Sequence, residues 1–387
     1  DRGIESKHRQ LTDTNTMNAT PQDTLFDLTL SDDQRMNRDT VQRFASAELR
    51  AVAMTADQAG HTPEDFCQKS LELGLSLMPI PEALGGAGVP RAPVSNALNH
   101  EDLAHGDLGL ALAVVSPLAF VNTLLDQGTQ AQQERYLPQF CGEQFLPATT
   151  AIMEPRATFE PTAPQCRAVR SDQGFVLNGH KTLVPLGLSA ELLLVVATLA
   201  DEGPAAFIVE GTASGMTRTE EANMGLRTLE LASVSFEDTP LPKEALLGDG
   251  PFDLQRFLDL SNLGICALAV GTCQGVLDYV TEYCNERVAF GEPITHRQSV
   301  AFMIADMAIE LEGMRLMTWR AAARAEQGLD FHQDAYLAKT FCAEQAMKIG
   351  TDGVQLLGGH GFCREHPVEM WYRNLRAIAL LEGVASL

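Results

Sequence analysis

The chain has 387 residues, 45% of them hydrophobic and 20% charged, which is the composition of an ordinary globular protein. This length is enough for a large core and for two or three domains. The 28 Lys and Arg against 51 Asp and Glu give a formal net charge of −23, which disfavours nucleic acid and anionic membranes as partners. A small anionic ligand would need local basic side chains and backbone N–H groups.

Eight cysteines are scattered along the chain without a CxxC pair. We therefore expect a thiol-reducing compartment, taken as the cytoplasm, with neither a disulfide framework nor a metal site. We expect no membrane-spanning segment, because no apolar run reaches the required length. The first 20 residues resemble neither a signal peptide nor a transit helix. Residues 1–25 are expected to form a disordered extension, natural or introduced for expression, with Met17 as a candidate start.

Residues 26–145 carry helical periodicity and are predicted to form an N-terminal helical domain. A capping box at Ser31–Gln34 predicts a helix start. Helical patterns follow over Thr40–Gln58 and Val94–Leu103. The continuously apolar run Leu110–Val115 is predicted to lie in a helix that is buried on most sides.

Residues 146–250 change to short β-type runs separated by turn residues, which predicts a small antiparallel β domain. The runs are Gly174–Leu177, Glu191–Leu199, Ala205–Val209 and Leu231–Phe236.

Residues 251–387 are helical again. Apolar side chains that step by three or four residues predict a core-facing helix ending near Gly328; they are Val300, Met303, Met307, Leu311, Met314 and Met317. Helical and β segments follow one another instead of alternating, which favours the α+β class over a Rossmann fold. The Gly358–Gly361 turn agrees, because a helical pattern and not a strand precedes it.

The most informative residues stand at the ends of these C-terminal helices. They are Arg287, Phe290-Gly291, Gln298, Gln355 with Gly358-Gly359-His360-Gly361, and Glu382. A basic residue, planar amides and glycines suit the pyrophosphate of a dinucleotide, while a carboxylate suits proton abstraction. Each also has a purely structural explanation, since Glu382 is of a type found mostly on the surface. Arg287 can complement a helix dipole, and the two glycines can stop a helix.

Four runs in this order resemble the acyl-CoA dehydrogenase family. They are Glu286–Ile294 followed by Gln298, Gln355–Phe362, Arg364–Glu369 and Leu381–Gly383. The resemblance covers essentially the whole chain from about Phe26. It implies an α+β fold with a helical N-terminal domain, an antiparallel β middle domain and a C-terminal four-helix bundle. It also implies FAD, an acyl-CoA thioester, electron transfer flavoprotein as acceptor, and assembly as a dimer of dimers.

Residue by residue, Glu382 matches the family's base, which removes the α proton while the β hydrogen leaves as hydride to the flavin. Arg287 matches an arginine that contacts the FAD pyrophosphate of a neighbouring subunit. Further cofactor contacts are expected at Phe290, Gln298, Gln355, Gly358 and Gly359.

The departures from the family pattern cluster around the flavin ring. Met153 stands at a usual threonine, Phe159 at a serine, and Leu183 at the tryptophan on which the ring packs. Pro185 stands where a threonine faces the flavin, and proline offers neither a hydroxyl nor an N–H. Asn262 replaces an arginine of the catalytic end. Met153 and Pro185 are thus the expected but altered flavin contacts.

The sequence therefore predicts an FAD-dependent α,β-dehydrogenation of an acyl-CoA thioester, with an undetermined acyl chain. Two alternatives remain open. The chain is a cofactor-poor subunit that completes the site of a homologous partner, or it is a redox-neutral acyl-CoA enzyme in which Glu382 works without flavin.

Overall fold

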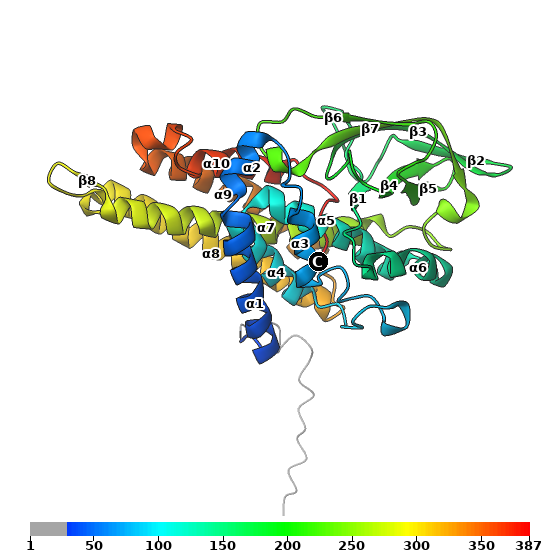
Figure 1. Ribbon diagram of the computed structural model, residues 1–387, viewed down its shortest axis with the longest axis horizontal. Coiled ribbons are helices and arrows are strands. Elements are labelled where there is room, and N and C mark those ends of the chain that lie inside the picture. Colours follow the sequence, from blue (N-terminus) through cyan, green and yellow to red (C-terminus); the bar gives the residue numbers. More distant parts are fainter. Residues whose placement is uncertain (1–28) are drawn as a thin grey trace, which may run out of the picture.

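The computed structural model describes residues 29–387 and divides into a helical body and a β domain at one side of it (Figure 1). The helices before and after the β domain pack together, although more than a hundred residues separate them in the chain. The predicted extension, residues 1–25, lies outside the described residues.

The N-terminal part is helical, as predicted, but its first helix is interrupted. Its helices are α1 (Asp32–Phe44), the π-helical turn Ala45–Arg50, α2 (Ala53–Ala59), α3 (Phe66–Ser70), α4 (Pro93–Gly106), α5 (Leu108–Gln127) and α6 (Gln130–Tyr136). The capping box is confirmed, because the Ser31 hydroxyl accepts from the Gln34 N–H at 3.1 Å and the Gln34 side chain accepts from the Ser31 N–H at 3.0 Å. The helical pattern predicted over Thr40–Gln58 is confirmed, but the π-helical turn and residues 51–52 divide it between α1 and α2.

A seven-stranded sheet forms the middle domain. Its strands are β1 (Ala148–Ala151), β2 (Arg167–Ser171), β3 (Gly174–Val184), β4 (Leu192–Leu199), β5 (Gly203–Glu210), β6 (Met216–Glu220) and β7 (Ala232–Pro242). The prediction of a wholly antiparallel sheet is wrong, because β4 pairs in parallel with both β1 and β2. Parallel neighbours need a long connection, and here the β2–β3 hairpin separates β1 from β4 along the chain.

The C-terminal part consists of α7 (Leu254–Glu286), α8 (Gln298–Glu326), α9 (His332–Leu356) and α10 (Val368–Leu375), with the small β8–β9 hairpin (Val288–Ala289 and Glu292–Pro293) between α7 and α8. Short 3-10 turns lie at Leu71–Leu73, Glu82–Leu84, Leu137–Cys141, Arg227–Leu229, Lys243–Ala245, Ile294–His296, Gly358–Phe362 and Arg376–Ala379. Four helices are present as expected, but α10 has only 8 residues, and α4 of the N-terminal part also packs along α7 and α8.

The core helices are more apolar than expected. α5 and α7 are long and apolar enough to cross a membrane, which corrects the expectation that no run reaches this length. However, 94% and 83% of their apolar windows are buried inside the protein, as in core helices. Leu110–Val115 lies in α5 and is buried, as predicted. On α8, Met307, Leu311 and Met314 are buried core residues, which confirms the predicted stripe.

Close packing of α4 on α7 depends on Gly271. A Cβ atom at this position would lie 2.0 Å from the Glu101 carbonyl oxygen, so any side chain would push the two helices apart.

We predict that Gly271→Ala lowers the free energy of unfolding by roughly 1–3 kcal/mol, because the backbones cannot separate without loosening the core. Thermal and urea unfolding measure the change. Gly250→Ala is the matched control, since a Cβ there meets nothing within 4 Å. Equal stability of the two variants would contradict the packing argument.

Candidate functional site

Glu382 lies in the segment that follows α10, between the helical body and the β domain. Its side chain is 21% exposed, and its neighbours Leu381 and Val384 are buried. One carboxylate oxygen, Oε1, lies 3.3 Å from the ammonium nitrogen of Lys339 on α9. Glu382 is therefore not a freely solvated carboxylate on the surface, which was the alternative explanation for this residue.

The turn at Gly383 fixes the position of Glu382. Gly383 has φ +71°, and a Cβ there would lie 2.5 Å from Ile152 and 3.2 Å from Phe257. Its carbonyl accepts a hydrogen bond from the Thr150 hydroxyl on β1. Glycine therefore lets this segment close onto β1 and α7, which brings the carboxylate to the junction of the two domains.

Met153 and Pro185 lie at the same junction. Met153 follows β1 and is 9% exposed, and Pro185 follows β3 and is buried. The Thr182 N–H donates to the Met153 carbonyl at 3.0 Å, which joins the two segments. A cavity of about 110 Å³ is lined by Leu183 of β3 and by Leu381, the neighbour of Glu382. Leu183 and Leu381 thus share one cavity, and Ile152, the neighbour of Met153, packs against Gly383, the neighbour of Glu382.

The Glu221 carboxylate accepts hydrogen bonds from the polar groups at this edge of the sheet. The Thr182 hydroxyl and the Ser233 hydroxyl both donate to its carboxylate, and the Leu183 N–H donates at 3.2 Å. Leu183 has φ +51°, an uncommon conformation for a branched side chain. The hydroxyl of Thr182 is therefore no substitute for those missing at Met153 and Pro185.

A buried ion pair holds the loop that leads to Phe159. Lys181 is fully buried and donates to Glu154 at 3.0 Å and to the Ile152 carbonyl at 2.9 Å. Burial opposes ionisation of Glu154, but the Lys181 charge and backbone N–H donors outweigh it and lower the pKa of this carboxyl. Burial lowers the pKa of the Lys181 ammonium, against the opposing effect of nearby acidic groups. The sequence had indicated no role for this pair.

Phe159 occupies the place of the family's serine as a packed side chain. It is half-buried against the cluster that contains Met153, and the Arg156 guanidinium lies 5.9 Å from its ring centre. Arg156 also lies 3.3 Å from Glu154. The loop therefore carries an aromatic ring and a cation next to the buried Glu154.

The residues predicted to bind a pyrophosphate gather at the opposite end of α7. Arg287 ends α7, Gln298 begins α8, and Gln355 lies near the end of α9. The turn after α9 is joined to the end of α7, because the Tyr283 hydroxyl lies 2.8 Å from His360 Nδ1. This end also carries the β8–β9 hairpin, which projects from the helical body (Figure 1).

These residues are free to meet a ligand. The side chains of Arg287, Gln298 and Gln355 are exposed and make no hydrogen bond or ion pair with any residue in the range 29–387. A Cβ at Gly358 or Gly359 would meet nothing within 4 Å. Phe290, at the hairpin tip, is 96% exposed.

One chain does not bring the two groups of residues together. Lys339, which contacts Glu382, also contacts Asn262 near the start of α7, whereas Arg287 stands at its end. Arg287 follows Asn262 by 25 positions, which corresponds to about 38 Å along the helix at 1.5 Å per residue. The pyrophosphate-type residues are therefore remote from the base within one molecule.

The residues predicted for the pyrophosphate and those predicted for the flavin ring differ in how well they suit a flavin dinucleotide. Unpartnered Arg287, two amides and open glycines suit a pyrophosphate. Around the expected ring position, Met153 and Pro185 are buried and Leu183 is half-buried, so the lining is apolar, and the nearby hydroxyls already donate to Glu221. The residues present thus fit the dinucleotide and the flat apolar face of a ring, with fewer side-chain hydrogen bonds to the ring's polar edge.

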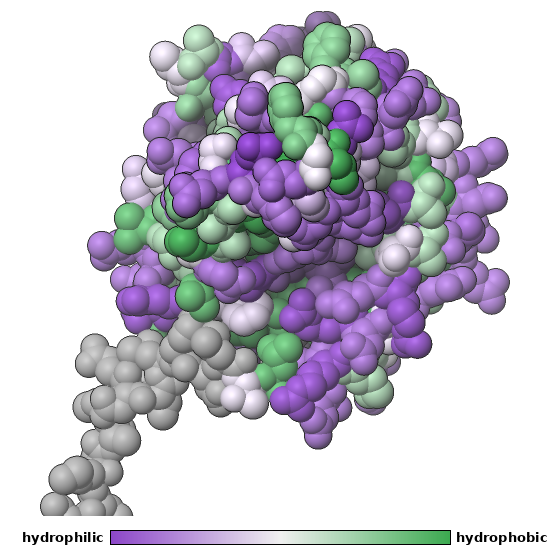
Figure 2. All heavy atoms as spheres, turned by 90° about the vertical axis from the view of Figure 1, so that its left-hand side faces the viewer, coloured by the Kyte–Doolittle hydropathy of each residue, from purple (hydrophilic) through white to green (hydrophobic). Residues whose placement is uncertain are grey.

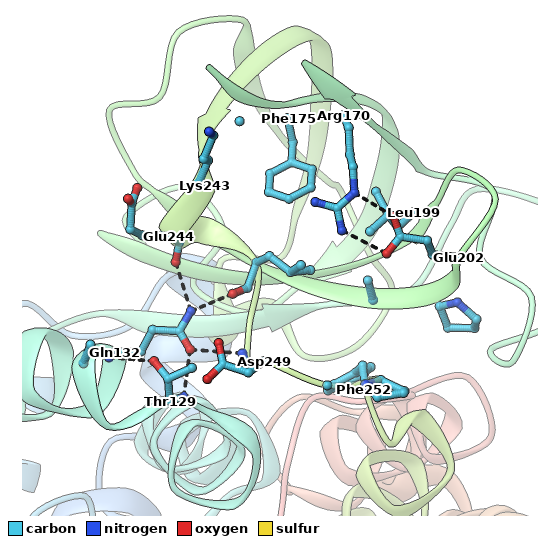
Figure 3. Close-up of a pocket in the computed structure, with 18 of the residues that line it drawn as sticks. Thr129, Gln132, Arg170, Phe175, Leu199, Glu202, Lys243, Glu244, Asp249 and Phe252 are labelled. Carbon is cyan, nitrogen blue, oxygen red and sulfur yellow. Dashed lines mark hydrogen bonds and ion pairs between the residues drawn. The ribbon is translucent and has the colours of Figure 1, made fainter. Parts of the chain in front are cut away.

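A separate cavity of about 900 Å³ lies between α6 and the β domain (Figure 3). On its β-domain wall, Arg170 donates to Glu202 through hydrogen bonds of 2.6 and 2.9 Å, and Gln132 of α6 donates to the Glu244 carbonyl at 2.9 Å. None of the predicted site residues lines this cavity. Within residues 29–387, no group of three or more His, Cys, Asp or Glu side chains is placed to hold a metal ion.

Three family models match the chain. The acyl-CoA dehydrogenase N-terminal domain matches residues 31–144, the middle domain residues 149–239, and the C-terminal domain residues 248–386. The mitochondrial short-chain specific acyl-CoA dehydrogenase of Mus musculus is 32% identical over 366 residues, which cover 92% of this chain and 88% of the relative.

Two solved structures extend the comparison. Butyryl-CoA dehydrogenase from Megasphaera elsdenii is 29% identical, with a TM-score of 0.84, over 91% of this chain and 95% of that chain. A chain in a structure described as electron transferring flavoprotein of Acidaminococcus fermentans is 30% identical, with a TM-score of 0.83, over 91% of this chain and 94% of that chain. The matching models, the helical and β domains and the shared length agree: the chain belongs to the acyl-CoA dehydrogenase family, whose members are enzymes that act on a CH–CH group.

Proposed function

We propose that this chain catalyses FAD-dependent α,β-dehydrogenation of an acyl-CoA thioester, with Glu382 as the base. The observation that carries the proposal is the placement of Glu382 at the domain junction. It is a half-buried carboxylate whose one polar contact among residues 29–387 is Lys339, and the adjacent Gly383 packs against Ile152, the neighbour of Met153. The family is FAD-dependent and acts on acyl-CoA, which supports the assignment of both ligands.

Glu382 takes the α proton in this proposal. The α C–H bond breaks, an O–H bond forms on the carboxylate, and the electron pair moves toward the thioester carbonyl. The buried neighbours Leu381 and Val384 limit the access of water, which strengthens electrostatic interactions at the reacting atoms. FAD, when bound, supplies the acceptor for the β hydrogen.

Two copies of the chain would complete one cofactor site. Glu382, Met153 and Pro185 belong to one copy, and Arg287, Phe290, Gln298, Gln355, Gly358 and Gly359 would come from a second copy at the pyrophosphate. Figure 2 faces the end of the molecule that carries the β8–β9 hairpin, where a mostly hydrophilic surface includes small apolar patches. Phe290 and Phe362 are 96% and 92% exposed, which suits contact with another chain.

An electron transfer flavoprotein is the acceptor that we propose for reoxidation, and a homo-oligomer is the proposed assembly. The similarity to a chain in an electron transferring flavoprotein structure supports this acceptor class. A cytoplasmic location remains our proposal from the scattered cysteines.

The purified protein is predicted to be yellow, and its flavin absorbance should bleach when a suitable acyl-CoA is added. Visible spectroscopy under anaerobic conditions measures both effects. A colourless protein that FAD cannot reconstitute would contradict the proposal. In that case, co-purification with a homologous chain would favour the cofactor-poor subunit, and turnover without flavin would favour the redox-neutral enzyme.

Glu382→Gln is expected to lower kcat by at least about 100-fold, because an amide cannot take the α proton while its size is nearly unchanged. Steady-state kinetics with an artificial electron acceptor provide the measurement. Glu365→Gln is the control, since Glu365 is exposed and makes no ion pair within the described part of the chain. Retention of full activity by Glu382→Gln would show that another group is the base.

Arg287→Gln is predicted to weaken FAD binding about 10- to 100-fold, because a charge-assisted hydrogen bond to phosphate is lost. Titration of apoprotein with FAD, followed by flavin fluorescence, measures the affinity. The exposed Arg167 on β2 supplies the matched control Arg167→Gln, and an equal loss in both variants would argue against the assigned contact.

A further inference from the structure

Lys339 is a buried ammonium group at the expected catalytic base. It lies on α9 and its side chain is 11% exposed. Its nitrogen donates to the Leu381 carbonyl at 2.7 Å, to Asn262 Oδ1 at 3.1 Å and to Glu382 Oε1 at 3.3 Å. An ammonium group has three N–H donors, so these acceptors use all of them.

The contacts of the Glu382 carboxylate are unequal. Oε1 is held by Lys339, whereas Oε2 has no hydrogen-bond partner among residues 29–387. The cation at Oε1 restricts the orientations of the carboxylate, and the other oxygen stays available for a proton from a ligand. The additional bond from Lys339 to the Leu381 carbonyl fixes the backbone that carries the base.

Asn262 completes this arrangement. In the resemblance described above, the corresponding position carries an arginine, which has no hydrogen-bond acceptor. Here the Asn262 amide oxygen accepts from Lys339 at 3.1 Å, so α7 holds the ammonium instead of repelling it. The cation of the site is thereby supplied by α9.

A second lysine on α9, Lys348, forms a solvent-exposed ion pair that can be compared with that of Lys339. Lys348 lies 3.7 Å from Glu310, and its side chain is 46% exposed. Exposed pairs of this kind contribute little, because water screens them and both side chains lose freedom. Lys339 differs in burial and in its two further hydrogen bonds.

We propose that Lys339 is a positioning residue for Glu382: it fixes the carboxylate through Oε1 and leaves Oε2 to take the α proton. The inference rests on the proposed function of Glu382 as the base. Lys339 keeps its proton throughout, since the proton moves only from the α carbon to Glu382.

Lys339→Met should lower kcat about 10- to 100-fold, because a small displacement of a base carries a penalty of this size. KM and the dissociation constant of an unreactive acyl-CoA thioether should change less than about threefold. Deuterium exchange at the α carbon of an acyl-CoA, followed by NMR in D2O with flavin-free protein, should slow by a similar factor. Lys348→Met is the control and should leave all of these values unchanged.

A purely structural role would weaken thioether binding and turnover together, and that result would overturn the proposal. If Lys339→Met fails to fold by circular dichroism, Lys339→Gln replaces it, since glutamine keeps a donor for the Leu381 carbonyl but carries no charge. Wild-type turnover in either folded variant would also overturn it.

A double-mutant cycle separates this inference from the proposed function. In a Glu382→Gln background, Lys339→Met should cause no further loss of turnover or of α-carbon exchange, and an additive loss would overturn the inference. If Glu382→Gln alone keeps wild-type activity, the base assignment itself fails. If Glu382→Gln is inactive while Lys339→Met is unaffected, only the positioning role fails.

Discussion

The close contact of Gly383 with Ile152 and Phe257 joins the helical body to the β domain, and the arrangement of the site depends on it. A residue with a Cβ would hold the C-terminal segment away from β1 and break its alignment with α9. With glycine there, the Thr150 hydroxyl holds the segment from one side and Lys339 from the other. The backbone around Glu382 is thus fixed from both domains before any ligand binds.

The length of α7 imposes a second constraint. The helix has 33 residues, with the Asn262–Lys339 contact near its start and Arg287 at its end. A rigid helix of this length keeps the pyrophosphate-type residues away from the base of the same molecule. In the function that we propose, two chains would have to associate for both groups of residues to meet one cofactor.

Features that depend on neighbouring residues or on family motifs could be predicted from the sequence, whereas contacts between distant segments could not. The capping box at Ser31 and the buried stripe around Met307 follow from spacing alone, and both are present. β1 has only four residues and no alternating pattern, so its parallel pairing with β4 had no signal in the sequence. The role of Lys339 was equally hidden, because its partners come from α7 and from a segment 42 residues downstream.

Glu221 gives the ring end of the site a particular character. Its carboxylate accepts hydrogen bonds from the Thr182 hydroxyl, the Ser233 hydroxyl and the Leu183 N–H. A ligand could use one of these donors only after its hydrogen bond to Glu221 is broken. Selection among ligands at this edge would then depend on shape complementarity instead of on hydrogen bonds. An apolar pocket changes the binding free energy by only about 1–3 kcal/mol for each added or missing methylene group. A surface of this kind would therefore tolerate modified rings.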